Sequence, residues 1–290
     1  MVWDEIENFL TFSSRIGKLL YLHRLDWLKR LKKRVELYLG QRPIEMVIDG
    51  FTIFVPRYIR RFEDREFYSI CLFSEAIQPG STVLDVGANV GYYTLLASRL
   101  VGAQGHVYAI EPDPRNLQFL TKNLRANRCV NVDVLPFAIS DRSGLMTLYL
   151  DIDPTETSLT YQQRRSKAIV GSLDVECVSI DELCEKENIQ KVDVIKMDIE
   201  GGEFKALLGA KETFRKNNVT LLIEFLPAVL KESGITSKEF IGLLEDMGFE
   251  PLLIHEKERV LLQNPLEFVD NDGKIFGEIK GNLLCHKKNR

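Results

Sequence analysis

Acidic side chains follow two apolar runs of this chain, in positions where they could act together on a bound molecule. Asp198 and Glu200 come directly after an apolar segment that ends at Met197, and Glu224 follows the apolar run Val219–Ile223. Ligands bind at the carboxyl ends of strands in open parallel sheets, so we expect these three carboxylates to converge there. Positioned carboxylates can take a proton from a reacting hydroxyl, and oxygen ligands also suit Mg²⁺. The residues alone leave both roles open, and no residue is assigned here as a metal ligand.

Three nearby residues are expected to have structural roles and not catalytic ones. Glu203 can cap the helix that starts there, with Gly201-Gly202 forming the turn before it. Lys196 is expected to extend from its strand toward solvent. His255 could reach the same edge, but a single histidine in such a position more often packs or caps a turn.

A glycine-rich turn forms the second candidate site. The apolar strand Thr82–Val86 runs into Gly87-Ala88-Asn89-Val90-Gly91, and a helical pattern begins at once. Such a turn brings backbone N–H groups close to a ligand, because a Cβ would block the approach. The spacing is not the Gly-x-Gly-x-x-Gly of nicotinamide and flavin sites. Asp85 at the strand end would repel a pyrophosphate, so the motif favours a cofactor with a cationic amino-acid end.

A further carboxylate lies where a nucleotide-binding unit needs one. The predicted strand His106–Ile110 ends in Glu111-Pro112, and Glu111 falls 20 residues after Gly91. Doubly wound nucleotide-binding folds place the carboxylate that holds ribose hydroxyls at about this distance. Asp113-Pro114 then provides an N-cap followed by proline at the first helical position.

Alternating strand and helix patterns position these residues. Strands are expected at 82–86, 106–110, 132–136, 192–197, 219–224, 250–254 and 282–286, and helices at about 92–100, 114–126, 180–187, 203–216 and 237–247. This alternation predicts an α/β fold with a doubly wound, mostly parallel seven-stranded sheet. After the third strand, Ala138 and Ile139 place a small residue beside apolar ones, which suits the face of an adenine. Segment 144–178 interrupts the pattern with two strand-like runs around a polar loop, 153–167, of a length that is usually functional.

The first 44 residues are expected to form a separate helical extension. Apolar residues recur at helical spacing, and the basic cluster Lys29–Arg34 follows them. Accessory helices with a solvated face are the favoured interpretation. The functional alternative is that this extension forms a substrate lid or an interfacial helix that contacts anionic headgroups. A hairpin is predicted at 45–55 around Asp49-Gly50, and a helix at 60–78. The expected division is therefore 1–44 and a main domain of 45–290 with its core at 80–286.

The composition indicates a soluble, cytoplasmic protein. Hydrophobic residues make up 45% of the 290 residues, and the net charge of −4 gives no general reason to expect nucleic acid as a partner. The five cysteines are scattered without a Cys-x-x-Cys pair, which indicates free thiols in a reducing compartment. Acidic residues near the start argue against a signal peptide, and no apolar run is long enough to span a bilayer.

Four segments together carry a resemblance to a known family. VLDVGANVGYYT, YAIEPDP, FAISD and KMDIEGGEFKALLGA are similar to the FkbM-type methyltransferases, a branch of the class I S-adenosylmethionine-dependent enzymes. The resemblance extends over residues 45–256 and leaves the N-terminal helices unexplained. It implies S-adenosylmethionine as cofactor, a Rossmann-like sheet whose last strand, at 282–286, is reversed, and methylation of a hydroxyl on a sugar, glycolipid or polyketide-type molecule.

The resemblance also implies roles for individual residues. The glycine turn would surround the methionine end of the cofactor, Glu111 would hold the ribose, and Asp198 would lie beside the sulfonium and the acceptor. The cofactor-binding residues expected in this way are Asp85, Gly87, Ala88, Asn89, Gly91, Glu111, Pro112, Ala138, Ile139 and Asp198. The expected catalytic residues are Asp198, Glu200 and Glu224.

Rival functions share parts of this pattern. A nicotinamide oxidoreductase would share the fold but needs the missing Gly-x-Gly-x-x-Gly. An RNA or DNA methyltransferase would share the cofactor, although no Asn/Asp-Pro-Pro-Tyr segment, which amino-group methylases of nucleic acids often carry, follows the fourth strand. An RNA or protein methyltransferase is kept as the alternative function. A non-catalytic S-adenosylmethionine-binding protein would have no use for the acids after that strand. We therefore expect a small-molecule or glycan acceptor and no nucleic acid.

Overall fold

The computed structural model describes residues 43–56, 66–151, 157–159, 168–271, 273–278 and 280–288. The chain divides into two compact units, residues 1–44 with 56–60 and residues 45–55 with 61–290. The helices predicted for the first 40 residues and most of the loop 153–167 lie outside the described residues. The site and its supporting elements belong to the second unit.

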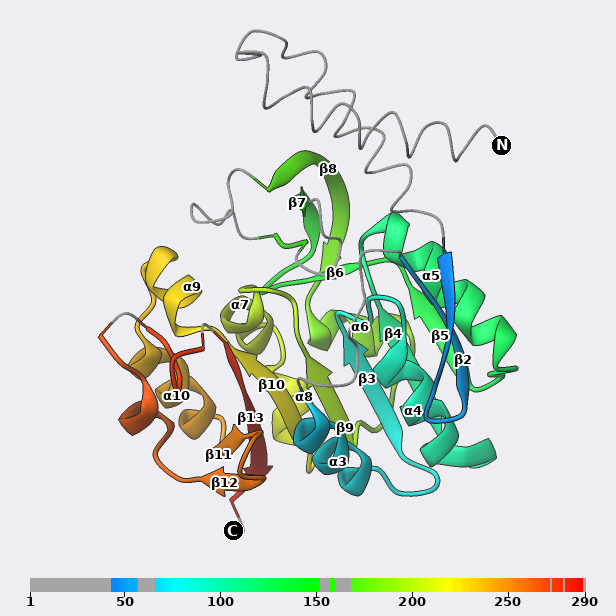
Figure 1. Ribbon diagram of the computed structural model, residues 1–290. Coiled ribbons are helices and arrows are strands. Elements are labelled where there is room, and N and C mark those ends of the chain that lie inside the picture. The colour runs from blue at the N-terminus through cyan, green and yellow to red at the C-terminus, as the bar shows by residue number, and fades with distance from the viewer. Residues whose placement is uncertain are drawn as a thin grey trace, which may run out of the picture. The chain divides into compact units, whose positions relative to one another are not determined.

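The main sheet has eight strands in the order β12-β11-β13-β10-β9-β3-β4-β5 (Figure 1). Their bounds are β3 Thr82–Val86, β4 His106–Ile110, β5 Val132–Leu135, β9 Val194–Met197, β10 Thr220–Phe225, β11 Phe249–His255, β12 Val260–Leu262 and β13 Gly281–Lys287. The strands from β10 to β5 run parallel. β13 lies antiparallel to both β10 and β11. The predicted α/β fold with a reversed last strand is confirmed, and β12 adds a short antiparallel edge strand to the seven expected.

Helices cover both faces of this sheet (Figure 1). They are α3 Phe67–Ala76, α4 Tyr92–Val101, α5 Pro114–Ala126, α6 Ile180–Lys186, α7 Glu203–Leu208, α8 Lys211–Lys216, α9 Pro227–Glu232 and α10 Ser237–Asp246, with 3₁₀ turns at Gly102–Gln104 and Pro265–Phe268. Asp113 caps α5 ahead of Pro114, and complete capping boxes start α6 at Ser179 and α10 at Thr236. These start signals were readable in the sequence.

The single helix predicted at 203–216 is wrong, because two helices meet at Gly209-Ala210. A Cβ on Gly209 would lie 2.4 Å from the carbonyl oxygen of Ser140. The oxygen of Gly209 accepts instead from the N–H of Asp181, 2.9 Å away. Contacts with a distant part of the chain therefore interrupt a helical pattern that is continuous in the sequence.

Neighbouring residues of the central strands pack in different hydrophobic clusters, one on each face of the sheet. Val194 packs in the cluster that contains Phe73 of α3, whereas Ile195 packs in the cluster that contains Phe240 of α10. Successive side chains of a strand point to opposite faces, so a sheet covered on both faces needs apolar residues at every position. This explains the continuous apolar runs of the sequence.

Two smaller sheets complete the unit. β6 Ala138–Ile139, β8 Ile169–Val178 and β7 Gly144–Asp151 form one of them, at the same end of the main sheet as α7 (Figure 1). β1 Pro43–Ile48 and β2 Phe51–Pro56 form the predicted hairpin. Its turn has φ of 49° at Asp49 and 77° at Gly50, and a two-residue turn of this class needs positive φ at both positions.

Two asparagine side chains of α5 bind the backbone of β2. Asn123 Oδ1 accepts from the N–H of Phe54 at 2.7 Å, and its Nδ2 donates to the oxygen of the same residue at 3.0 Å. One turn later Asn127 repeats the pattern on Thr52, at 3.0 and 2.7 Å. Asn123 Nδ2 also donates to the oxygen of Val90 in the glycine turn, at 2.7 Å. The hairpin is thus attached to the helix that follows Glu111.

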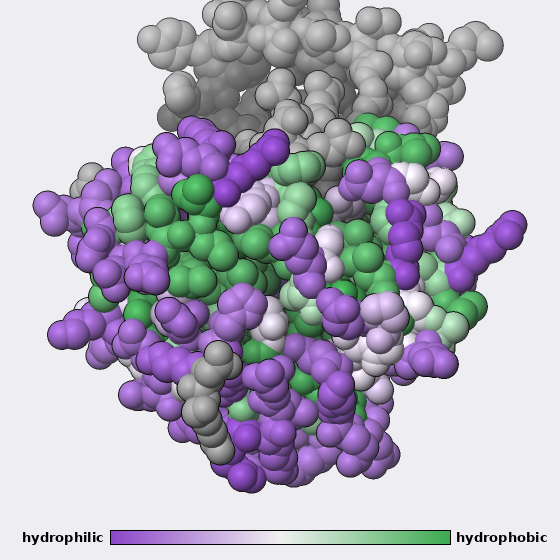
Figure 2. All heavy atoms as spheres, turned by 90° about the horizontal axis from the view of Figure 1, so that it is seen from below, coloured by the Kyte–Doolittle hydropathy of each residue, from purple (hydrophilic) through white to green (hydrophobic). Residues whose placement is uncertain are grey.

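The face in Figure 2 carries mostly hydrophilic side chains, with apolar ones in several patches, the broadest of them left of centre. Among the described residues, the large apolar side chains that are exposed are Val47, Phe67, Val130, Leu145, Val260, Leu266 and Phe276. No helix in the described part of the chain is both long and apolar enough to cross a membrane.

Candidate active site

The three predicted carboxylates converge at the ends of β9 and β10. Asp198, Glu200 and Glu224 each offer one oxygen, and these oxygens all lie within 4.8 Å of one another. Glu224 is 3% exposed and Glu200 is 5% exposed. The parallel pairing of β9 with β10 brings their carboxyl ends together, as expected from the sequence.

Two lysines neutralise this cluster. Lys280 Nζ lies 3.3 Å from Glu200 Oε1 and 3.1 Å from Glu224 Oε1. Lys196 Nζ lies 3.3 Å from Asp198 Oδ2 and donates to the oxygen of Gly87 at 3.3 Å. The prediction that Lys196 extends to solvent is wrong, since its side chain is only 8% exposed. Desolvation of that ammonium is offset by the acids around it, which raise its pKa.

The surroundings shift the pKa values of two acids of the cluster in opposite directions. Burial, and then the charges of Asp198 and Glu200, raise the pKa of Glu224 well above its usual range. Burial also opposes the charge on Asp198, but Lys196 and Lys280, with a hydrogen bond from Glu224, lower its pKa on balance. The site therefore stabilises the charged form of Asp198 and disfavours the charged form of Glu224. Environments that separate the pKa values of neighbouring acids are typical of acid–base chemistry.

Glu203 braces the loop that carries Asp198 and Glu200. Its Oε1 accepts from the N–H of Ile199 at 2.8 Å, and its Oε2 accepts from the N–H of Gly201 at 2.9 Å. Within this loop Glu200 has a φ of 55°, which a non-glycine residue adopts only when its surroundings hold it there. Burial raises the pKa of Glu203 to about 7. The prediction that Glu203 caps α7 is wrong, because its carboxylate accepts from N–H groups that precede the helix, and no side chain among the described residues caps the helix start.

The glycine turn lies against this acid loop. Gly87 has a φ of 81°, and a Cβ built on it would lie 1.9 Å from the carbonyl oxygen of Asp198. At Gly91 a Cβ would meet Leu120 Cδ1 at 2.5 Å. The expectation that these glycines make room for a ligand is thus corrected in part, because the protein itself fills the space beside both.

Glu111 joins the turn to the next strand. Its Oε2 accepts from the N–H of Asn89 and its Oε1 from the N–H of Asp113, both at 2.8 Å. Burial raises the pKa of this carboxyl to about 7. The two sequence motifs, the glycine turn and the acid 20 residues later, therefore meet in space. Pro112 follows directly and is half-buried.

The remaining predicted site residues, which lie on β3, in the glycine turn and on β6, are all buried. Asp85 is fully buried, and its Oδ2 accepts from Thr94 Oγ1 at 2.5 Å while its Oδ1 has no partner among the described residues. Burial raises its pKa, against the lowering effect of Lys196. Ala88 is buried beside the turn. Ala138 and Ile139 are buried on β6, where they pair with β8.

The site also contains residues that the sequence analysis missed. Lys280 could have been found from the reversed strand, because β13 pairs Gly281 with Phe225 and so starts beside the end of β10. Glu66, just before α3, accepts from the Tyr93 hydroxyl at 3.2 Å, and burial followed by the charge of Asp198 raises its pKa. No motif marks Glu66. His255 packs on Phe276 and accepts from the N–H of Glu258. It therefore packs and caps a turn, as expected from the sequence.

Side chains from α5 and the small sheet border the same region. Ser158 Oγ donates to the oxygen of Glu200 at 2.7 Å. Arg115 donates to the oxygen of Asp151 and to Thr157 Oγ1, both at 3.0 Å. The small sheet is therefore bonded both to the acid loop and to the helix behind Glu111.

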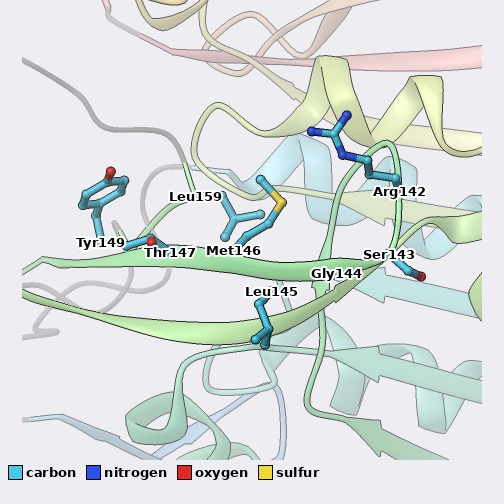
Figure 3. Close-up of a pocket in the computed structure, with 8 residues that line it drawn as sticks. All are labelled: Arg142, Ser143, Gly144, Leu145, Met146, Thr147, Tyr149 and Leu159. Carbon is cyan, nitrogen blue, oxygen red and sulfur yellow. The ribbon is translucent and has the colours of Figure 1, made fainter.

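The small sheet also carries a cavity of its own, of about 350 Å³ (Figure 3). Met146 and Leu159 lie side by side there, Arg142 extends over the same side of β7, and Leu145 points the other way (Figure 3). A second cavity, of about 580 Å³, lies between α10 and β11. None of the predicted site residues lines either one.

Comparison with known proteins identifies the family. A family model described as the methyltransferase FkbM domain matches residues 85–251, more than half of the chain. The chain belongs to the FkbM methyltransferases. As its motifs predicted, the matched domain is of the S-adenosylmethionine-dependent methyltransferase class. The matched segment contains the glycine turn, Glu111 and all three acids of the cluster.

Two curated relatives align with the same part of the chain. Hexuronic acid methyltransferase AglP of Haloferax volcanii is 27% identical over 178 residues, which cover 61% of this chain and 66% of AglP. The 2-O-methyltransferase NoeI of Sinorhizobium fredii is 26% identical over 179 residues, which cover 58% of this chain and 72% of NoeI. The chain thus spans just under two thirds of AglP. The solved structure of an FkbM methyltransferase from Methylobacillus flagellatus, 18% identical, covers 79% of this chain and 46% of that chain with a TM-score of 0.45.

Proposed function

We propose that this FkbM methyltransferase methylates a hydroxyl of a sugar or a related small molecule, with Asp198 receiving the hydroxyl proton. The observation that carries the proposal is the convergence of Asp198, Glu200 and Glu224 at the sheet edge beside the glycine turn. The surroundings there lower the pKa of Asp198 and raise that of Glu224. The relative named a hexuronic acid methyltransferase supports a sugar derivative as the acceptor, and the relative named a 2-O-methyltransferase supports an oxygen as the methylated atom.

The residues present fit S-adenosylmethionine. Glu111 presents a buried carboxylate that two backbone N–H groups already orient, and this carboxylate would hold the ribose hydroxyls. The buried Oδ1 of Asp85 lacks a partner among the described residues, which suits a cationic amino group nearby. We assign Gly87–Gly91 to the methionine end, and Pro112, Ala138 and Ile139 to the neighbourhood of the ribose and adenine. When bound, the cofactor supplies a methyl group on a positively charged sulfur.

The chemical work of the chain is then alignment and proton removal. Holding the acceptor hydroxyl in line with the methyl group can contribute about 7–11 kcal/mol. The new carbon–oxygen bond makes the hydroxyl proton strongly acidic, so even a weak base such as Asp198 can take it as the bond forms. Lys196 holds Asp198 in place. The raised pKa of Glu224 favours its protonated form, which can donate to the acceptor oxygen or to Asp198.

Product analysis tests this function. The purified enzyme would be incubated with S-adenosylmethionine labelled in the methyl group and, in separate reactions, uronic acids, neutral oligosaccharides, RNA and a protein extract. We expect label in a sugar fraction as an alkali-stable methyl ether. Label only in RNA or protein would replace the proposal, and cofactor binding without any transfer would favour a non-catalytic role.

The cysteines support a reducing location. All five, at positions 71, 129, 177, 184 and 285, are free thiols in the structure. Free thiols without disulfides are usual for proteins of the cytosol. We therefore propose that the enzyme works in the cytoplasm.

A further inference from the structure

Lys280 stands where a divalent cation would be expected. Three carboxylate oxygens within 4.8 Å of one another, two of them on buried side chains, are the donor set that Mg²⁺ or Mn²⁺ prefers. The ammonium of Lys280 lies 3.1 Å from Glu224 and 3.3 Å from Glu200, so it contacts two of the three acids directly. Its own side chain is 37% exposed, which places the charged end at the boundary between the acids and solvent.

Backbone pairing fixes this position. β13 pairs Phe225 with Gly281 and Glu224 with Asn282, so the residue before Gly281 must lie next to the end of β10. The same strand is held on its other side by β11. The pairing of β13 with β10 and with β11 therefore fixes the backbone of Lys280 beside the cluster. Its position does not depend on a flexible side chain alone.

In the described part of the chain, two ammonium groups already face the three acids of the cluster. Lys196 pairs with Asp198 and Lys280 pairs with Glu200 and Glu224. A divalent ion among these acids would lie beside two ammonium groups, and like charges at such distances repel strongly in a buried site. Among the described residues, Oε2 of the buried Glu224 has no hydrogen-bond partner, so the acids keep an oxygen to offer once a lysine charge is removed.

We propose that Lys280 is a positioning residue that serves as the built-in cation of the active site, holding Glu200 and Glu224 and keeping divalent metal ions out. The proposal rests on the proposed function, because it assigns a purpose to the acid cluster in methyl transfer. Its chemical consequence is independent of the acceptor: removal of the Lys280 charge turns an ammonium site into a metal site.

Manganese binding tests this directly. Mn²⁺ would be titrated into the full chain while its electron paramagnetic resonance signal is followed, for the wild type, Lys280→Met and Lys274→Met. Lys274 is exposed on the same segment and serves as the matched control. We expect weak binding to the wild type and the control, and binding at least about ten-fold tighter to Lys280→Met, because a like charge within hydrogen-bonding distance has been removed. Adding Glu224→Gln to Lys280→Met should abolish the gain.

Activity supplies the second readout. Wild-type turnover should be unchanged by EDTA, whereas Lys280→Met should lose turnover and recover part of it when Mn²⁺ or Mg²⁺ is added. A purely structural lysine would give no such rescue. Tight Mn²⁺ binding by the wild type, or loss of its turnover in EDTA, would overturn the proposal even if Lys280→Met failed to fold. If no acceptor is ever methylated, the function proposed above fails, while the manganese titration still decides the role of Lys280.

Discussion

The carbonyl oxygen of Asp198 occupies the place that a side chain on Gly87 would need, only 1.9 Å from an ideal Cβ. The N–H of Asp198 also donates to the oxygen of Val86, at 3.0 Å. The turn assigned to the cofactor and the loop that carries the acids are therefore in direct backbone contact. A change in one must displace the other.

Gly87→Ala should destabilise the fold, and not only cofactor binding. Gly80 has a similar φ of 85° but has nothing within 4 Å of its ideal Cβ, so Gly80→Ala measures the cost of the backbone conformation alone. That cost is about 1–2 kcal/mol. Gly87→Ala should lose clearly more free energy of unfolding in urea denaturation, because the backbone of Asp198 must also move. Equal losses of unfolding free energy in the two variants would show that the backbone of Asp198 moves away from the new Cβ at little cost.

Asp198→Asn should keep the fold and most of the cofactor affinity while turnover falls by about 10²–10⁴, the usual contribution of acid–base assistance. Asp246→Asn, on the exposed end of α10, is the control for loss of one carboxylate. Steady-state kinetics and calorimetric binding of S-adenosylmethionine would be compared for both. Normal turnover in Asp198→Asn would move the proton-accepting role to Glu200.

Cofactor affinity should depend on pH through Glu111. Burial raises the pKa of this carboxyl to about 7, so it is largely protonated below that pH. Ribose hydroxyls donate to the carboxylate form, and their binding must therefore weaken as the pH falls below about 7, by at most about ten-fold per pH unit. Calorimetry at pH 6, 7, 8 and 9 would show this slope. In Glu111→Gln the affinity should be lower at pH 8 and the slope should be lost; an unchanged slope would assign it to another group.

The stability of the ligand-free protein should change in the opposite sense. The folded-state pKa of Glu111 and of Glu203 is about 7 instead of 4.5, so the folded chain holds these protons more tightly than the unfolded chain does. Both groups therefore favour folding at low pH, and this contribution is lost as the pH rises from about 4.5 to about 7. Thermal unfolding across that range should show the loss, and Glu203→Gln should reduce it. A flat profile would contradict the raised pKa values.

Asn123→Ala should cost more stability than Asn127→Ala. Asn123 is fully buried and makes three hydrogen bonds, to both backbone groups of Phe54 and to the oxygen of Val90. At about 1 kcal/mol for each bond, with buried groups left unsatisfied, we expect a loss of about 3 kcal/mol or more. Asn127 is half-buried and should cost less. Urea denaturation measures both, and a larger loss for Asn127→Ala would contradict this ranking.

The site residues that could be predicted from the sequence lie at the ends of strands. Asp198, Glu224 and Glu111 each follow or end an apolar run, and parallel strands must bring such positions to one edge. Glu66 could not be found in this way, because it belongs to no motif and reaches the cluster through the packing of α3. Lys280 was missed because it precedes a reversed strand, and only the pairing of β13 with β10 brings it to the same edge. Both positions depend on contacts between distant parts of the chain. The interruption of the helix at Gly209 was missed for the same reason.

The position of β13 also sets an order of events during synthesis. This strand lies between β10 and β11 although it follows both in the chain (Figure 1). Until residues 281–287 have left the ribosome, β10 and β11 each lack a neighbour, and exposed strand edges invite pairing with other chains. Lys280 arrives with the same segment, so the acids of the nascent domain stay without their second ammonium until the final strand is inserted.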